Sequence, residues 1–294
     1  MIKTTINKYG EDKCYISFSG GKDSTVLSFL VDLALPNNKI PRVYANTGIE
    51  LNIIKEFVED IMKNDDRFIM IKPKVPIKKM LEKEGYPFKS KMHSRYWNTY
   101  SNNHKSISAL KYKNGEYSFN VSKCPKILRY QFEDSYDGPK ISDKCCLNLK
   151  EKPLKEYEKE NHKTLAIIGI MRDEGGRRSK AKCIVKTGKN TAHFHPLAVV
   201  SKEWEQWFID KYHIRLCDIY YPPYNFTRTG CKGCPFNPTL QKDLDTLERY
   251  FPNERKQCEV IWKPVYEEYR KIGYRLKKQR QTTIFDYLEE EKND

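Results

Sequence analysis

Short apolar runs alternate with helical patterns in the first part of the chain. The run Cys14–Phe18 ends in a glycine turn, and Ser24–Leu35 is then apolar on all sides, as a buried helix is. Three later runs are continuously apolar, as strands buried on both faces are: 40–45, 67–72 and 164–170. An amphipathic helix is expected over 50–62. The alternation predicts an α/β fold with a doubly wound parallel sheet, whose ligands bind at the carboxyl ends of its strands.

The rest of the chain has weaker sheet signals. Residues from about 74 to 150 are polar, aromatic and rich in Lys, which predicts an inserted segment of helices and loops. Helical patterns dominate the C-terminal third: Lys202–Tyr212, Leu240–Tyr250 and Glu259–Ile272. We therefore expect a nucleotide-binding α/β domain over 1–200 and a helical part over 201–294 that carries a Cys-rich loop.

Composition restricts the function and the setting. The chain has 294 residues, a formal net charge of +15 and nine cysteines. The charge favours polyanionic partners, either nucleic acid or nucleotides, although a Lys-rich surface is also common in ordinary enzymes. No apolar run approaches the roughly 20 residues of a membrane span, so we expect a cytoplasmic protein without a membrane partner. In a reducing compartment, clustered cysteines indicate metal ligands or reactive thiols.

A glycine turn joins the first strand to the first helix. Its six residues are Ser19, Gly20, Gly21, Lys22, Asp23 and Ser24. Backbone N–H groups of such a turn converge on an anion, and the helix N-terminus adds partial positive charge. Lys22 would contact phosphates, the two serines would donate hydrogen bonds, and Asp23 would cap the helix or help to hold Mg²⁺. The turn lacks the spacing of a Walker loop.

This SGGKDS turn resembles the signature of the PP-loop ATP pyrophosphatase superfamily, with its adenine nucleotide alpha hydrolase-like fold. The resemblance implies ATP binding and transfer of AMP to a substrate. Two further segments, 44–50 and 169–177, resemble loops of the phosphoadenylylsulfate (PAPS) reductase family. The nucleotide-binding residues that they imply are Asn46, Thr47, Gly48, Gly169, Arg172, Glu174 and Arg177. The arginine side chains would bind phosphate or sulfate oxygens.

Two pairs of cysteines supply four thiolates, as a tetrahedral metal site or an iron-sulfur cluster requires: Cys145, Cys146, Cys231 and Cys234. The pairs resemble the cluster ligands of adenylylsulfate reductases, which implies a 4Fe-4S cluster. Zinc is the alternative metal. The four cysteines could also bind no metal and be buried as small apolar residues. Cys124 is a candidate for a further ligand or a reactive thiol that acts with Lys22 and Asp23 in catalysis.

The resemblance leaves three functions open. The chain has no cysteine in its C-terminal tail, where assimilatory reductases carry their nucleophile, and its pattern also suits DndC-like relatives. We therefore expect adenylation-linked sulfur transfer, on nucleic acid or a small molecule, with a sulfur-donor protein as partner. The alternatives are a PAPS or adenylylsulfate reductase with an unusual thiol, and a non-catalytic nucleotide-sensing protein on DNA. The segment Gln281–Leu288 fits a sliding-clamp docking peptide, although a plain helix end also fits.

Overall fold

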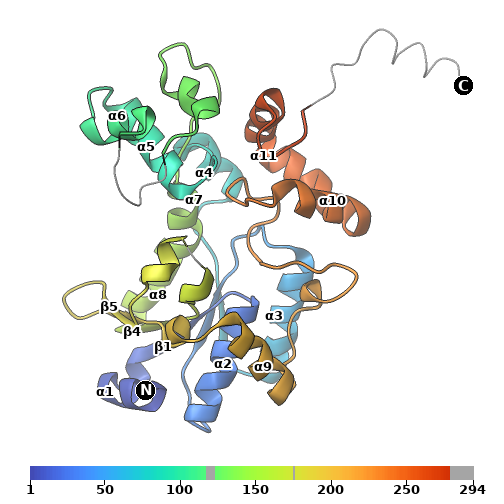
Figure 1. The fold of residues 1–294 in the computed structure, drawn as a ribbon. Helices are drawn as coiled ribbons and strands as arrows, with labels where there is room; N and C mark the ends of the chain where they lie inside the picture. Colours follow the sequence, from blue (N-terminus) through green and yellow to red (C-terminus); the bar gives the residue numbers. More distant parts are fainter. Residues whose placement is uncertain (117–122, 175, 279–294) are drawn as a thin grey trace, which may run out of the picture. The chain divides into compact units, whose positions relative to one another are not determined.

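A computed structural model describes residues 1–116, 123–174 and 176–278 of the protein (Figure 1). The chain divides into two compact units. The first comprises Met1–Lys83 and Lys144–Lys232, and the second comprises Glu84–Asp143 and the chain from Gly233 onward. The sequence-based division, with a boundary near residue 200, partitions the chain differently. The candidate clamp-docking segment Gln281–Leu288 lies outside the described residues.

The first unit is built on one six-stranded sheet with the strand order β3-β2-β1-β4-β6-β5. The strands are β1 (Cys14–Phe18), β2 (Arg42–Ala45), β3 (Phe68–Ile71), β4 (Leu165–Ile168), β5 (Ile184–Lys186) and β6 (Ala192–Phe194). All neighbours pair in parallel except β5 and β6, which are antiparallel. The predicted α/β fold with a mainly parallel sheet is confirmed. The two short strands β5 and β6 were not expected from the sequence.

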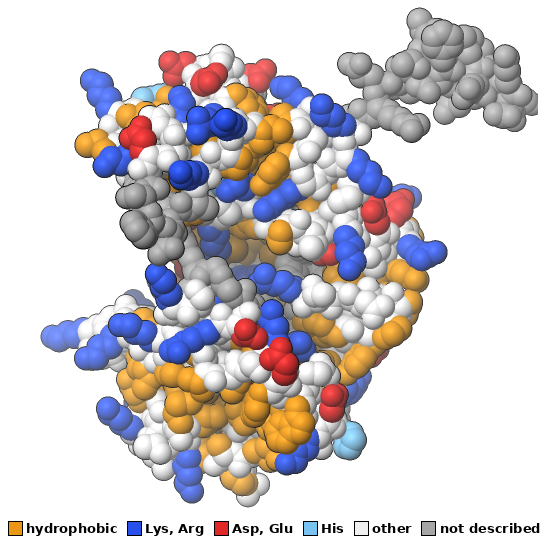
Figure 2. Space-filling model, in the orientation of Figure 1, with side chains coloured by type: hydrophobic (Ala, Val, Ile, Leu, Met, Phe, Trp, Pro, Cys, Tyr) orange, Lys and Arg blue, Asp and Glu red, His pale blue; other side chains and the backbone are white. Residues whose placement is uncertain are grey.

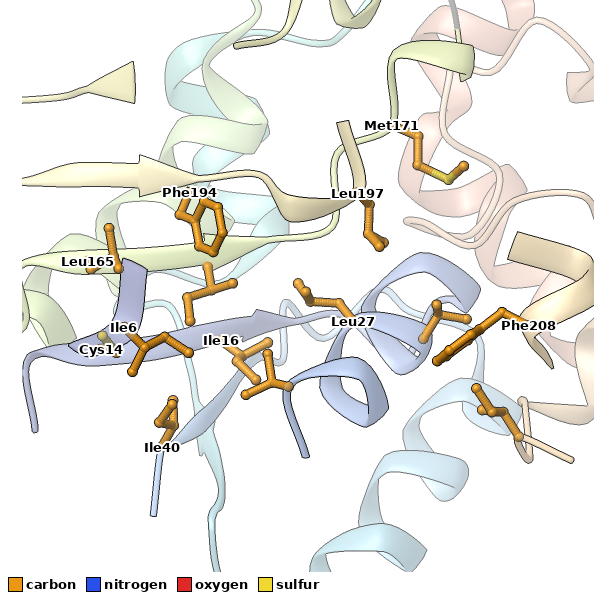
Figure 3. Close-up of a cluster of buried hydrophobic side chains, with 14 of the residues drawn as sticks. Ile6, Cys14, Ile16, Leu27, Ile40, Leu165, Met171, Phe194, Leu197 and Phe208 are labelled. Atoms are coloured by element: carbon orange, nitrogen blue, oxygen red, sulfur yellow. The ribbon is translucent and has the colours of Figure 1, made fainter. Parts of the chain in front are cut away.

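Helices cover both faces of this sheet, as side chains that alternate along β1 require. Ile16 belongs to a buried cluster with side chains of α1 (Ile2–Tyr9), α2 (Lys22–Ala34) and α9 (Lys202–Tyr212). Figure 3 shows part of this cluster around β1 and α2. The adjacent Tyr15 belongs to a second cluster with Tyr157 of α8 (Lys152–Glu160). The sheet is therefore buried on both sides, which explains its continuously apolar strands.

The remaining helical segments of the first unit are short except for α3, which packs against β3. They are η1 (Glu11–Lys13), α3 (Asn52–Asn64), α7 (Lys144–Cys146), the π-helical η3 (Leu147–Glu151), η4 (Arg172–Glu174), η5 (Gly176–Lys180), η6 (Pro196–Val199) and η7 (Asp218–Tyr220). The helix α4 (Ile77–Glu84) ends at the division between the units.

The second unit is mainly helical. Its elements are α5 (Lys91–Asn102), α6 (Ile107–Asn114), the 3-10 helix η2 (Lys126–Phe132), α10 (Leu240–Tyr250) and α11 (Pro252–Ile272). At its centre His93 is fully buried, with its ring nitrogens 3.0 Å from the Tyr112 hydroxyl and 2.8 Å from Gln131 Oε1. Burial lowers the pKa of His93 to about 3, so the imidazole is neutral and structural.

A buried arginine ties β2 to the end of α2 in the first unit. Arg42 has no exposed surface, and its guanidinium lies 2.6 Å from the Asp32 carboxylate. It also donates to Ser28 Oγ and to Asn38 Oδ1, at 3.1 and 2.9 Å. A buried charge is tolerated when it is paired and hydrogen-bonded in this way.

The exposed side chains reflect the basic composition. Lys and Arg side chains outnumber Asp and Glu on the face that Figure 2 shows. Among the described residues, no helix is both long and apolar enough to cross a bilayer.

Candidate functional site

The turn predicted to bind phosphate lies between β1 and α2. Gly20 has a φ of +69°, and a Cβ at this position would lie 2.9 Å from methyl groups of Ile54 and Val58 on α3. Gly21 is the N-cap of α2, and a Cβ there would lie 2.7 Å from the Thr229 hydroxyl. The first glycine is required by backbone conformation and packing. At the second, a Cβ would press against a side chain from a segment far along the chain.

The two serines tie the turn together. The Ser24 hydroxyl is nearly buried and donates to the Gly21 carbonyl at 2.8 Å. It also accepts from the Ser19 backbone N–H at 3.2 Å. The Ser19 hydroxyl lies 3.1 Å from Ser24 Oγ and accepts from the Gly21 N–H at 3.3 Å. In this structure both hydroxyls therefore hold the conformation of the turn.

Lys22, the first residue of α2, is paired with a buried carboxylate. Its ammonium lies 3.2 Å from Oε2 of Glu205 on α9, a side chain that is 1% exposed. Oε1 of Glu205 has no hydrogen-bond partner among the described residues. Burial, and next the neighbouring Asp23 carboxylate, raise the pKa of Glu205, while Lys22 opposes the shift. Glu205 therefore has a cation, Lys22, and a second carboxyl group, Asp23, as neighbours.

These groups line a cavity of about 950 Å³ within the first unit. The volume suits a nucleotide-sized ligand. Four lining side chains are cationic: Lys22, Arg178, Lys202 and Arg228. Of the predicted nucleotide-binding residues, Ser19, Gly21, Lys22, Asp23, Ser24 and Gly169 line the cavity. The N-terminus of α2 and these cations are features that suit a polyanion, while Asp23, Glu205 and Asp210 add negative charge to the lining.

The segment after β4 contributes in a different way from the prediction. A Cβ at Gly169 would lie 3.0 Å from the Asp23 carbonyl, so a glycine lets this segment pack against the start of α2. Arg172 donates from Nε to the Ala181 carbonyl at 2.7 Å and is not among the lining residues. The side chains of Glu174 and Arg177 lie outside the described part of the structure, whereas the neighbouring Arg178 lines the cavity.

The loop after β2 forms a closed turn. Thr47 donates from its backbone N–H and from its hydroxyl to the Glu50 carboxylate, the latter at 2.6 Å. Asn46 Oδ1 accepts from the N–H of Gly48, whose φ is +79°. Glu50 then pairs with Cys231 in an isolated antiparallel bridge. These residues therefore lie beside the segment that carries Cys231 and do not line the large cavity.

A second, smaller cavity of about 80 Å³ lies at the carboxyl ends of β1 and β2. Its lining includes Ser19, Tyr44, Lys150 and Thr229. Ser19 and Thr229 line both cavities, so the two are adjacent within the first unit. The Tyr44 hydroxyl is buried and has no hydrogen-bond partner among the described residues. A ligand atom in this cavity would meet an unsatisfied hydroxyl.

Cys146 and Cys231 both belong to the first unit, and Cys146 is near enough to affect the pKa of Cys231. Burial raises the pKa of Cys231, the nearby Cys146 thiol contributes to the rise, and Lys150 opposes it. Cys145 is buried in the same unit, whereas Cys234 belongs to the second unit. No group of three or more His, Cys, Asp or Glu side chains suited to a metal ion occurs among the described residues. The four paired cysteines are therefore divided between the units, three in the first and one in the second.

Cys124, the predicted reactive thiol, belongs to the second unit, whereas Lys22 and Asp23 belong to the first. It is 2% exposed, and burial raises its pKa to about 11. The sulfur is therefore a thiol at neutral pH.

Sequence reasoning missed several residues of the large cavity: Arg178, Glu205, Tyr220, Arg228 and Thr229. One of them had a detectable signal. Glu205 occupies the buried stripe of α9 together with Phe208 and Ile209, at the i, i+3, i+4 spacing. A carboxylate on the apolar face of a helix indicates a buried partner, here Lys22. Arg178 and Tyr220 lie in the short 3-10 helices η5 and η7, and Arg228 and Thr229 lie in a loop, so none of them has a pattern in the sequence.

Three solved structures are similar to this chain. Among solved structures, PAPS reductase from Candida auris in its phosphate complex has 11% identity, covers 74% of this chain and 87% of its own, and gives a TM-score of 0.41. FMN adenylyltransferase from Candida glabrata has 15% identity, coverages of 79% and 57%, and a TM-score of 0.46. The U34-tRNA thiolase NcsA from Methanococcus maripaludis, with its [4Fe-4S] cluster, has 15% identity, coverages of 90% and 78%, and a TM-score of 0.36.

A search of curated proteins gave no match. The family model described as phosphoadenosine phosphosulfate reductase domain matches residues 13–120 and 110–237, which include the phosphate-binding turn and both cavities. This match spans well over half of the chain. The chain therefore belongs to the phosphoadenosine phosphosulfate reductase domain family.

Proposed function

We propose that this protein binds the phosphates of ATP at the N-terminus of α2, transfers AMP to an acceptor, and so prepares the acceptor for replacement of oxygen by sulfur. The observation that carries the proposal is the cavity around Lys22, in which a glycine turn, a helix N-terminus and several cations meet. Membership of the PAPS reductase domain family supports an adenine nucleotide as the ligand.

In the first step, an acceptor oxygen attacks the α-phosphorus of ATP. The bond between the α- and β-phosphates breaks, and pyrophosphate leaves with the electron pair. Lys22 and the loop N–H groups stabilise the negative charge that develops on the phosphate oxygens. Arg178 and Arg228 line the same cavity and add positive charge. Mg²⁺, held by Asp23 and the phosphates, would supply further charge neutralisation.

In the second step, sulfide delivered by a sulfur-donor protein displaces AMP. A carbon-sulfur bond forms, the carbon-oxygen bond to AMP breaks, and AMP leaves as a good leaving group. The position of Cys231 supports this assignment, because it follows Gly230 and pairs with Glu50, and both of these residues line the smaller cavity. A thiol-rich region next to a nucleotide site is suited to receiving sulfur.

A 4Fe-4S cluster on Cys145, Cys146, Cys231 and Cys234, with zinc as the alternative, is proposed from the sequence pairs alone. Three of these cysteines belong to the first unit and Cys234 belongs to the second. The proposal predicts about four irons and four sulfides per chain after anaerobic purification, as this cluster type requires. Stoichiometric zinc without iron would select the alternative.

Nucleic acid is the acceptor that we propose, because the net charge of +15 favours a polyanion. Reduction of PAPS or adenylylsulfate is the second candidate, and family membership favours it. That reaction needs a thiolate nucleophile. The raised pKa of Cys124 and of Cys231 weighs against either residue in this role.

The test is an anaerobic incubation of the protein with ATP, PAPS and adenylylsulfate in separate reactions. Each contains a cellular nucleic-acid fraction and sulfide, and pyrophosphate, AMP and sulfite are quantified. The proposal predicts pyrophosphate from ATP and sulfur in the nucleic acid, with no sulfite from either sulfonucleotide. Sulfite from PAPS or adenylylsulfate, without pyrophosphate from ATP, would establish the reductase instead.

A further inference from the structure

The backbone N–H of Lys22 is occupied by a side chain from a remote segment. It donates to the Tyr220 hydroxyl oxygen at 2.9 Å. The same hydroxyl donates to Thr229 Oγ1 at 3.0 Å. Tyr220 and Thr229 are the first and last residues of a segment that lines the large cavity. This segment lies close to the glycine turn, because a Cβ at Gly21 would lie 2.7 Å from the Thr229 hydroxyl.

This N–H is one that a phosphate would use. It belongs to the first residue of α2, a helix of 13 residues, and such N–H groups have no partner within the helix. Phosphates bind at helix N-termini through these groups. The cavity beside this N–H is also lined by cationic side chains, among them Arg178 and Arg228, which suit a phosphate.

The two contacts of Lys22 differ in what a phosphate must displace. Its ammonium has three donors, so it can contact Glu205 and a phosphate together. The backbone N–H has one hydrogen, so the Tyr220 oxygen and a phosphate oxygen compete for it. Burial raises the pKa of Tyr220 to about 12, which leaves its oxygen a neutral acceptor at pH 7. An anionic phosphate oxygen is the stronger acceptor and would replace it.

We propose that the Tyr220 hydroxyl takes the place of a phosphate oxygen at the N-terminus of α2 and yields it when a pyrophosphate-containing nucleotide binds. The inference rests on the proposed nucleotide site and adds a residue that sets its affinity.

The experiment measures binding of inorganic pyrophosphate and of ATP with Mg²⁺, by isothermal titration calorimetry, to the wild-type protein and to Tyr220→Phe. Removing the competing hydroxyl should tighten the binding of both ligands by about fivefold, the ratio expected for one neutral hydrogen bond. Tyr212→Phe is the matched control, because this tyrosine lies in the same unit, is 38% exposed and does not line the cavity. Its affinities should equal those of the wild type.

Each outcome has a distinct meaning. Affinity of Tyr220→Phe that equals or falls below the wild-type value would overturn the inference and leave the proposed function standing. Absence of binding to every variant would refute the proposed function, and the inference with it. Should Tyr220→Phe fail to fold by circular dichroism, Thr229→Val removes the acceptor that holds Tyr220. This variant should tighten pyrophosphate binding by about twofold to threefold, and an unchanged affinity would refute the inference.

Discussion

Replacement of the two glycines of the phosphate-binding turn by alanine should have unequal effects on stability. At Gly20, φ is +69°, and an L-residue in this region costs about 1–2 kcal/mol. The new Cβ would also lie 2.9 Å from methyl groups of Ile54 and Val58, which are 1% and 0% exposed. These β-branched side chains cannot rotate away, and overpacking adds about 1–3 kcal/mol. Gly20→Ala should therefore lower the free energy of unfolding by about 2–5 kcal/mol.

Gly21→Ala provides the matched comparison. Its φ of −84° and ψ of 162° are allowed for alanine, which gains about 0.4–1 kcal/mol from a less flexible unfolded chain. The opposing clash, at 2.7 Å, is with the hydroxyl of Thr229, a side chain in a loop. We expect a change within about 1 kcal/mol. Urea unfolding followed by circular dichroism measures both. The reasoning fails if Gly20→Ala is no more destabilising than Gly21→Ala.

Three further predictions concern separate parts of the molecule. Lys22→Met should weaken ATP binding at least about tenfold in calorimetry, as loss of a charge-assisted contact implies, whereas Lys55→Met, at an exposed i,i+4 pair, should not. Arg42→Met should lower the free energy of unfolding by about 3 kcal/mol, because Asn38 and the Ile40 carbonyl lose their buried donor; a midpoint in urea equal to that of the wild type would contradict this. His93 is neutral in the fold. Its contribution to the free energy of unfolding is therefore complete above the pKa of the unfolded chain and is lost as pH falls toward the folded pKa. By pH 4.5 the second unit should be about 2.5 kcal/mol less stable, and unfolding curves that coincide at pH 7 and 4.5 would refute this.

The fold was predictable where burial is complete. Strands β1 to β4 are mostly apolar because helices cover both faces, and their positions agree with the predicted runs to within two residues at each end. The strands β5 and β6 have three residues each, and all of β5 is exposed, so neither produces a pattern. The helices α10 and α11 of the second unit overlap the helices predicted over 240–250 and 259–272. The helices within the inserted segment were not placed, because contacts between distant segments, such as those of His93, leave no local pattern.

The candidate site was predictable only in its local part. The turn from Ser19 to Ser24 carries its own signature, since glycine conformations and a helix N-terminus are local properties. Tyr220 and Thr229 reach this turn from about 200 residues away along the chain, through side-chain contacts that no spacing encodes. In the loop after β2, a local motif was misleading. Thr47 was predicted for the nucleotide site, but its hydroxyl donates to Glu50 of the same loop.

The most direct test of the account is the position at which ATP is cleaved. The protein is incubated with radiolabelled ATP, Mg²⁺, sulfide and a cellular nucleic-acid fraction, and the products are separated. The account predicts AMP and pyrophosphate in equal amounts with the wild type and with Lys55→Met, and neither product with Lys22→Met. Release of ADP and phosphate, or equal amounts of AMP and pyrophosphate from the Lys22→Met variant, would contradict it.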